Sequence, residues 1–219
     1  YSEKLLLMNY LPMVYPKPFT KRKLSEDELN KKSIYSCPQT LFKIHPDFDQ
    51  IIFDILEKDK KGIFYLIKDS NKVWYKKLIK RLSKNKKYDS KKIIFMDPLN
   101  YEDYLLHLGR SSVLLDPLYY GAGNSFFESM LFGTPTVTFP TDYIKSRLVL
   151  GAYKQMEIKN APIATSIQNY IDLAVKYANR DDIRALKNSY KTAAEKKLFN
   201  TKKAGEEFNK IISNLFNET

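Results

Sequence analysis

Five short apolar runs, separated by segments of helical periodicity, constrain the fold of this 219-residue chain more than any other feature. Short apolar runs are typical of buried strands, whereas the segments between them repeat apolar residues every three or four positions, as helices do. The runs lie at residues 33–37, 63–67, 92–96, 112–115 and 136–139. Strands that alternate with helices form parallel sheets with right-handed connections. The pattern therefore predicts a Rossmann-like α/β domain.

The helical pattern also indicates how the chain is organised. Helices are predicted between the strands at 47–58, in the lysine-rich segment after residue 67, at 101–108 and at 126–132, and then at 167–178, 182–197 and 202–216. Residues 1–31 have three prolines and a charged run and are predicted to be a connector. We therefore expect a connector at 1–31 and one lobe with a helical C-terminal segment at 32–219. Because the chain begins with Tyr1 rather than methionine, we also expect it to be part of a longer protein.

Composition narrows the class of protein. Hydrophobic residues make up 43% of the chain, which favours a globular domain over a disordered one. No run approaches the roughly 18 apolar residues that a membrane-spanning helix needs, and the N-terminus lacks a secretory pattern. A single cysteine, Cys37, excludes an intrachain disulfide and suits a reducing compartment. The expectation is a cytoplasmic protein without a membrane partner.

The net charge is +12, and residues 68–92 carry eleven Lys or Arg against two Asp. Such a patch can attract nucleic acid. However, Lys72, Lys76, Lys80 and Lys84 repeat every four residues on a different face from an apolar stripe, as on the solvated side of a helix. Nucleic acid is therefore the less favoured partner, and the positive field equally suits small ligands that carry phosphate.

A glycine loop follows the fourth predicted strand. The sequence Gly121-Ala122-Gly123-Asn124-Ser125 separates this strand from a predicted helix, and Glu128 lies about one turn into that helix. A strand, a glycine loop and a helix start can bind an anion through N–H and hydroxyl donors, here from Gly123, Asn124 and Ser125. The Glu128 carboxylate can accept hydrogen bonds from a ribose diol. Two plainer alternatives stay open: Asn124 and Ser125 as helix caps, and Glu128 as a complement to the helix dipole.

Three further residues follow other strand ends. Lys43 comes after the first strand and has the charge to neutralise a pyrophosphate. Tyr101 and Tyr104 come after the third strand, where their rings can flank a base. Lysine and tyrosine are abundant in this chain, so surface or packing roles remain alternatives for all three. No zinc spacing, Walker motif, Ser-His-Asp order or HExxH sequence is present, and no pair of carboxylates stands out as acid and base.

Five segments, at residues 37–49, 121–128, 131–140, 146–147 and 198–202, together resemble the catalytic region of the protein O-GlcNAc transferase and SPINDLY family. The segment from Cys37 to Asp49 is similar to the start of that family's C-terminal catalytic lobe. The segments 121–128 and 131–140 resemble its sugar-nucleotide loop and the next strand, Ser146-Arg147 matches a Ser-Arg pair, and 198–202 is similar to its C-terminal stretch. The matches keep their order over residues 33–216.

The resemblance implies the donor-binding lobe of a GT-B glycosyltransferase. It assigns Lys43 to the pyrophosphate, Asn124 and Ser125 to the phosphates and Glu128 to the ribose, and it places Thr40 among the donor contacts. Family members have other residues at three further positions expected to contact the donor, namely Tyr101, Tyr104 and Gly123. The donor is therefore expected to be UDP-GlcNAc or another nucleotide diphosphate sugar, such as GDP-fucose or UDP-glucose.

The resemblance also implies a metal-independent, inverting transfer to Ser or Thr of a protein acceptor. The catalytic histidines and acceptor contacts are expected in a preceding lobe, with helical repeats before it. Two alternatives remain open. One is a related enzyme that glycosylates asparagine, a glycan or a lipid, and the other is a non-catalytic module that binds nucleotide sugars or nucleic acid.

Overall fold

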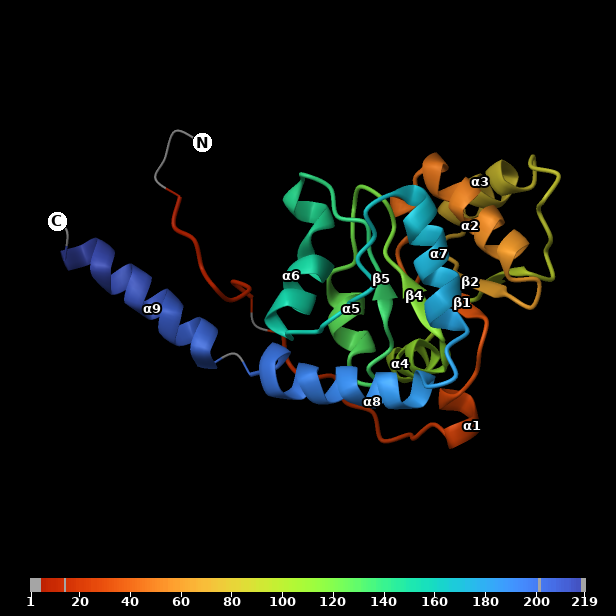
Figure 1. Ribbon diagram of the computed structural model, residues 1–219. Coiled ribbons are helices and arrows are strands. Elements are labelled where there is room, and N and C mark those ends of the chain that lie inside the picture. Colours follow the sequence, from red (N-terminus) through yellow and green to blue (C-terminus); the bar gives the residue numbers. More distant parts are fainter. Residues whose placement is uncertain (1–4, 14, 201, 218–219) are drawn as a thin grey trace.

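The computed structural model describes residues 5–13, 15–200 and 202–217. Its centre is a sheet of five parallel strands in the order β3-β2-β1-β4-β5 (Figure 1). The predicted parallel α/β fold is confirmed. The strands are β1 (Ile34–Ser36), β2 (Ile63–Ile67), β3 (Ile93–Met96), β4 (Val113–Leu115) and β5 (Thr136–Val137). Each lies within a predicted run, and β5 is short because Thr138 forms only an isolated bridge to Ile163.

Helices cover both faces of this sheet. The helices of the described ranges, in chain order, are α1 (Glu26–Leu29), η1 (Leu41–Lys43), α2 (Pro46–Lys58), α3 (Val73–Leu82), α4 (Tyr101–Arg110), α5 (Asn124–Ser129), η2 (Ile144–Ser146), α6 (Leu148–Gln155), α7 (Ile167–Ala178), α8 (Ile183–Ala193), η3 (Ala194–Leu198) and α9 (Lys202–Asn217), of which α9 lies away from the sheet (Figure 1). Helices α2 and α7 contact each other on one face, and α4 and α5 contact each other on the opposite face (Figure 1). No helix in the described ranges is long and apolar enough to cross a membrane.

Apolar periodicity explains how α2 is held on the sheet. Phe48, Ile51, Ile52 and Ile55 are at most 1% exposed and form one stripe of the helix. Pro46 occupies its first turn, where a missing N–H costs nothing, and the His45 side chain accepts a hydrogen bond from the Asp47 N–H at its start. Burying each large apolar side chain contributes roughly 1.5–3 kcal/mol, so this stripe fixes α2 against the strands.

The strand order creates a reversal beside β1. The chain runs outward from β1 to β2 and β3, and it then returns to place β4 on the other side of β1. Tyr35 in the middle of β1 therefore lies opposite Phe64 of β2 and Val113 of β4. In open parallel sheets, ligands bind at the carboxyl ends of the strands where the order reverses. A ligand site is therefore expected at the loops that follow β1 and β4.

Residues 15–31 run along the lobe, whereas the first described residues of the chain lie away from the sheet on the side of α9 (Figure 1). The Thr20 hydroxyl donates to Glu102 at 2.5 Å, and the Arg110 guanidinium donates to Glu28 at 2.8 Å. Leu11, Met13 and Tyr15 pack against a second apolar cluster formed mainly by α5, α6 and α8, with η3. The predicted connector therefore contributes to the packing of the structure, while the boundary at residue 31 stays a prediction.

Candidate functional site

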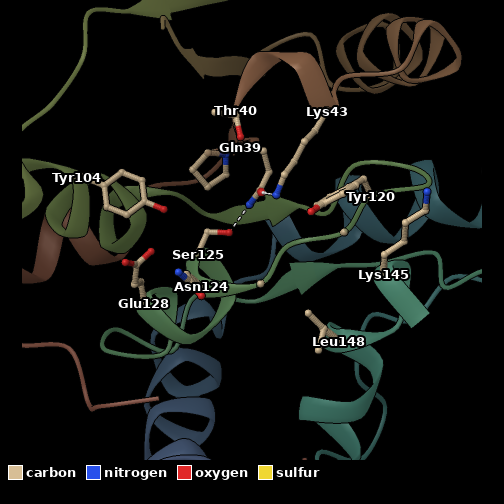
Figure 2. Close-up of a pocket in the computed structure, with 13 residues that line it drawn as sticks. Gln39, Thr40, Lys43, Tyr104, Tyr120, Asn124, Ser125, Glu128, Lys145 and Leu148 are labelled. Atoms are coloured by element: carbon tan, nitrogen blue, oxygen red, sulfur yellow. Dashed lines mark hydrogen bonds between the residues drawn. The ribbon is translucent and has the colours of Figure 1, made fainter. Parts of the chain in front are cut away.

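A cavity of about 580 Å³ lies where the loops after β1 and β4 face each other. Figure 2 shows η1 and the residues before it on one side and α5 on the other. Further walls come from α4, from the loop after β4 and from the start of α6. The cavity therefore occupies the position that the reversal of strand order predicts.

The β1 side of the cavity carries a fixed cation. Lys43 Nζ donates to Gln39 Oε1 at 3.1 Å and lies 4.5 Å from the centre of the Tyr120 ring. The Gln39 amide in turn donates to Ser125 Oγ, which links the two sides of the cavity (Figure 2). Partial burial lowers the pKa of Lys43, and the nearby Asp116 carboxylate opposes that shift. The ammonium group is thus held at the wall, close to the start of α5.

The loop after β4 is held in shape by Asp116. Its carboxylate accepts from the Ala122 N–H and, at 2.6 Å, from the Thr138 hydroxyl. The Gly121 N–H donates to the Lys145 carbonyl at 2.9 Å, and a Cβ at Gly121 would lie 3.1 Å from the Asp116 carboxylate. The tight approach favours glycine there. Because the Gly121 and Ala122 N–H groups are used within the protein, they are not available to a ligand.

Helix α5 presents the polar residues of the opposite wall. Gly123 is its N-cap, and no side chain caps the helix, so the alternative in which Asn124 and Ser125 act as caps is wrong. Glu128 lies beyond the first turn, where the helix dipole has little effect, and this weakens its dipole alternative too. The side chains of Asn124, Ser125 and Glu128 all line the cavity (Figure 2). They are therefore placed to contact a ligand.

Tyrosines gather around Glu128 at the other end of the cavity. Tyr104 lines the cavity, and burial together with the neighbouring Glu128 carboxylate raises its pKa. Tyr101 is 54% exposed and lies beside Glu128 without lining the cavity; burial and Glu128 raise its pKa as well. A third tyrosine, Tyr15, donates a hydrogen bond to Glu128 Oε1 at 3.0 Å. This end is aromatic and holds a single carboxylate.

The structure brings together seven of the eight residues predicted for the site. Those that line the cavity are Thr40, Lys43, Tyr104, Gly123, Asn124, Ser125 and Glu128, whereas Tyr101 lies next to it. The prediction missed Gln39, Tyr120 and Lys145, which also line it. Gln39 had a detectable signal, because it precedes Lys43 by four residues in the same segment. No group of three or more His, Cys, Asp or Glu within the described ranges is placed to hold a metal ion.

A comparison with protein-family models matches residues 19–208 to glycosyl transferase family 41. The chain belongs to this family. The match includes every residue predicted for the site, from Thr40 to Glu128. A comparison with curated protein sequences found no match.

Solved structures share the fold. A mutant of the O-GlcNAc transferase of Thermobaculum terrenum has a TM-score of 0.67 at 18% identity, over 85% of this chain and 34% of that one. A mutant of S. aureus TarM, in complex with fondaparinux, alpha-GlcNAc-glycerol and UDP, has a TM-score of 0.64 at 16% identity, over 96% of this chain and 40% of that one. The family 41 chain thus spans well under half the length of these two proteins.

Proposed function

We propose that this family 41 chain is the donor-binding half of a glycosyltransferase that uses a nucleotide diphosphate sugar. The observation that carries the proposal is the meeting of Lys43 and Gln39 with Ser125 and Glu128 across one cavity at the reversal of strand order. Lys43, Asn124 and Ser125 bind the diphosphate, and Glu128 accepts from the ribose diol. Tyr104, with Tyr101 beside it, forms the base end. The family membership and the neighbouring structures support this assignment.

The chemistry assigned to Lys43 is stabilisation of the leaving group. An acceptor oxygen forms a bond to the anomeric carbon of the sugar while the bond from that carbon to the diphosphate oxygen breaks. The electron pair leaves with the diphosphate, so negative charge grows beside Lys43 Nζ as the reaction proceeds. A fixed cation at this position stabilises the transition state more than the ground state. The acceptor proton passes to a base that we assign to the preceding lobe.

The proposed acceptor is a Ser or Thr hydroxyl of a protein, and the proposed donor sugar is GlcNAc. Transfer is proposed to invert the anomeric centre and to need no metal ion. A radiolabelled-sugar assay of the full-length enzyme tests the acceptor class, because alkaline β-elimination releases sugars from Ser and Thr but not from asparagine. Label that resists release, or that enters a glycan or lipid fraction, would contradict the protein-hydroxyl assignment.

Calorimetric titration with UDP, GDP and a short oligonucleotide tests the donor site. We expect one of the diphosphates to bind and the oligonucleotide not to bind. Lys43→Ala should weaken diphosphate binding about 10- to 100-fold, the range for a hydrogen bond to a charged group. It should also slow transfer by the full-length enzyme about 100-fold or more.

The matched control is Lys76→Ala, which removes an exposed lysine of α3 that does not line the cavity. This variant should bind and transfer like the unsubstituted protein. Unchanged turnover in Lys43→Ala would refute the role given to this residue. Binding of the oligonucleotide without binding of either diphosphate would instead favour the nucleic-acid alternative.

A further inference from the structure

A residue far from every predicted motif contacts the carboxylate that we assign to the ribose. The Tyr15 hydroxyl donates to Glu128 Oε1 at 3.0 Å, although the two residues are 113 positions apart. Tyr15 also precedes the family match, which begins at residue 19. Neither the sequence motifs nor the family match therefore assigns a role to Tyr15.

The position of Tyr15 is fixed by packing and by hydrogen bonds on both sides along the chain. Its ring stacks on Phe127 with centroids 4.9 Å apart and an angle of 22° between the planes. Before it, the Leu11 N–H donates to Gln155 Oε1 at 2.8 Å, and after it, the Lys17 ammonium pairs with Glu195 at 2.7 Å. These contacts attach the segment to the lobe on both sides of Tyr15, and this places the Tyr15 hydroxyl beside Glu128.

The hydroxyl acts as a hydrogen-bond donor at neutral pH. Burial and the Glu128 carboxylate raise the pKa of Tyr15, so the phenol keeps its proton. A carboxylate has two oxygens with about four acceptor positions. Tyr15 occupies one of them, and the hydroxyls of Tyr101 and Tyr104 also interact with this carboxylate. Glu128 lines the cavity, whereas Tyr15 does not. The carboxylate is therefore held from outside the cavity wall and keeps an acceptor position for a ligand inside.

We propose that Tyr15 is a positioning residue that orients the Glu128 carboxylate for the ribose diol of the donor. The proposal rests on the proposed function, which places the ribose at Glu128. A glutamate on a helix surface otherwise samples several rotamers, and fixing one of them on ligand binding costs conformational entropy. A second residue that holds the acceptor in place before the ligand arrives reduces that cost. The N-terminal segment would thus take part in nucleotide recognition through one hydroxyl group.

Calorimetry with the whole chain tests this assignment, with UDP and 2′,3′-dideoxy-UDP as probes and the corresponding guanosine diphosphates in parallel. Tyr15→Phe keeps the ring that stacks on Phe127 and removes only the hydroxyl. We expect Tyr15→Phe to bind the ribose diphosphate about three- to ten-fold more weakly, as for the loss of one hydrogen bond. Binding of the dideoxy analogue should not change. A purely structural role would weaken both probes equally.

Two further variants sharpen the test. Tyr10→Phe removes a hydroxyl from the same segment and should leave both affinities unchanged. In a Glu128→Ala background, Tyr15→Phe should have no further effect, because the acceptor group that Tyr15 positions is gone.

The remaining outcomes distinguish this proposal from the proposed function. Equal or tighter binding of the ribose diphosphate by Tyr15→Phe overturns the positioning role and leaves the donor site intact; tighter binding would mean that Tyr15 competes with the ligand. If neither UDP nor GDP binds to the unsubstituted chain, the proposed function fails and this proposal fails with it. A thermal melt of each variant separates these results from a loss of folding.

Discussion

Replacement of Asp116 by asparagine provides a direct test of how the loop beside the cavity is held. Asp116 is 3% exposed, and its carboxylate accepts from the Ala122 N–H and the Thr138 hydroxyl. Burial raises the pKa of Asp116 to about 7, although these two donors and the charge of Lys43 oppose the shift. Asp116→Asn keeps the shape of the side chain and one acceptor oxygen but removes the titrating group.

The sign of the effect follows from the two states of the protein. In the unfolded chain the carboxyl has its ordinary pKa of 3.8, so between about pH 4 and 7 the folded state binds a proton that the unfolded state lacks. The free energy of unfolding therefore falls as the pH rises through this window and stays low above it. A pKa that rises from 3.8 to about 7 corresponds to a loss of roughly 4 kcal/mol of unfolding free energy over the whole window.

Urea unfolding at pH 5, 6, 7 and 8 measures this difference. Asp116→Asn should gain stability relative to the unsubstituted protein by about 1 kcal/mol for each pH unit between 5 and 7. Asp142→Asn, which changes an exposed carboxylate, is the control and should not reproduce that trend. Asp116→Ala should be less stable than Asp116→Asn at every pH, by about 1–3 kcal/mol for each donor left without a partner. A difference between Asp116→Asn and the unsubstituted protein that is constant across the pH range would refute the reasoning.

Three other substitutions test contacts that stabilise the lobe or hold Lys43 in the cavity. Gly133→Ala should prevent stable folding in a thermal melt, because Gly133 has a φ of +70° and an added Cβ would lie 1.9 Å from the Lys187 carbonyl oxygen. Burial and Arg184 lower the pKa of Lys187 to about 7, so the unfolding free energy of the unsubstituted protein should rise between pH 7 and 10. Lys187→Met should lose that rise in urea unfolding. Gln39→Ala should weaken UDP or GDP binding several-fold in calorimetry, with little change in Tm, because Lys43 loses its acceptor.

The strands and most helices could be predicted because their signals are local. The apolar run at 63–67 and the apolar stripe of α2 can each be recognised from a short stretch of sequence, and the structure has a strand and a helix at these positions. The position of the site could be predicted for a related reason. Once β1 and β4 are neighbours, the residues that follow them meet, so Lys43 and Ser125 lie across one cavity. The order of the strands in the sequence and in the sheet was therefore sufficient to predict the position of the cavity.

Contacts between distant segments could not be predicted in the same way. Nothing near Tyr15 in the sequence indicates that it reaches Glu128, since that pairing depends on the path of a segment with little regular structure over α5. Lys145 comes from a short turn that faces the glycine loop only in the folded chain. The capping alternative fails for a physical reason as well: Asn124 and Ser125 are good caps by type, but the backbone places Gly123 at the cap.

The two ends of the cavity are formed by different elements, and this bears on the donor preference of the proposed enzyme. The proposed diphosphate end is formed by residues of the loops after β1 and β4, so the sheet itself sets the distance between its two sides. The proposed nucleoside end is lined by Tyr104 of α4 and by Glu128, and Tyr101 and Tyr15 lie beside Glu128 without lining the cavity. Side chains there can change without moving a strand. Because the departures from the family pattern at Tyr101 and Tyr104 lie at this end, we expect exchange of these two residues to alter the preference between UDP and GDP. Affinity for inorganic pyrophosphate should stay the same, and a parallel loss of pyrophosphate affinity would contradict this division of the site.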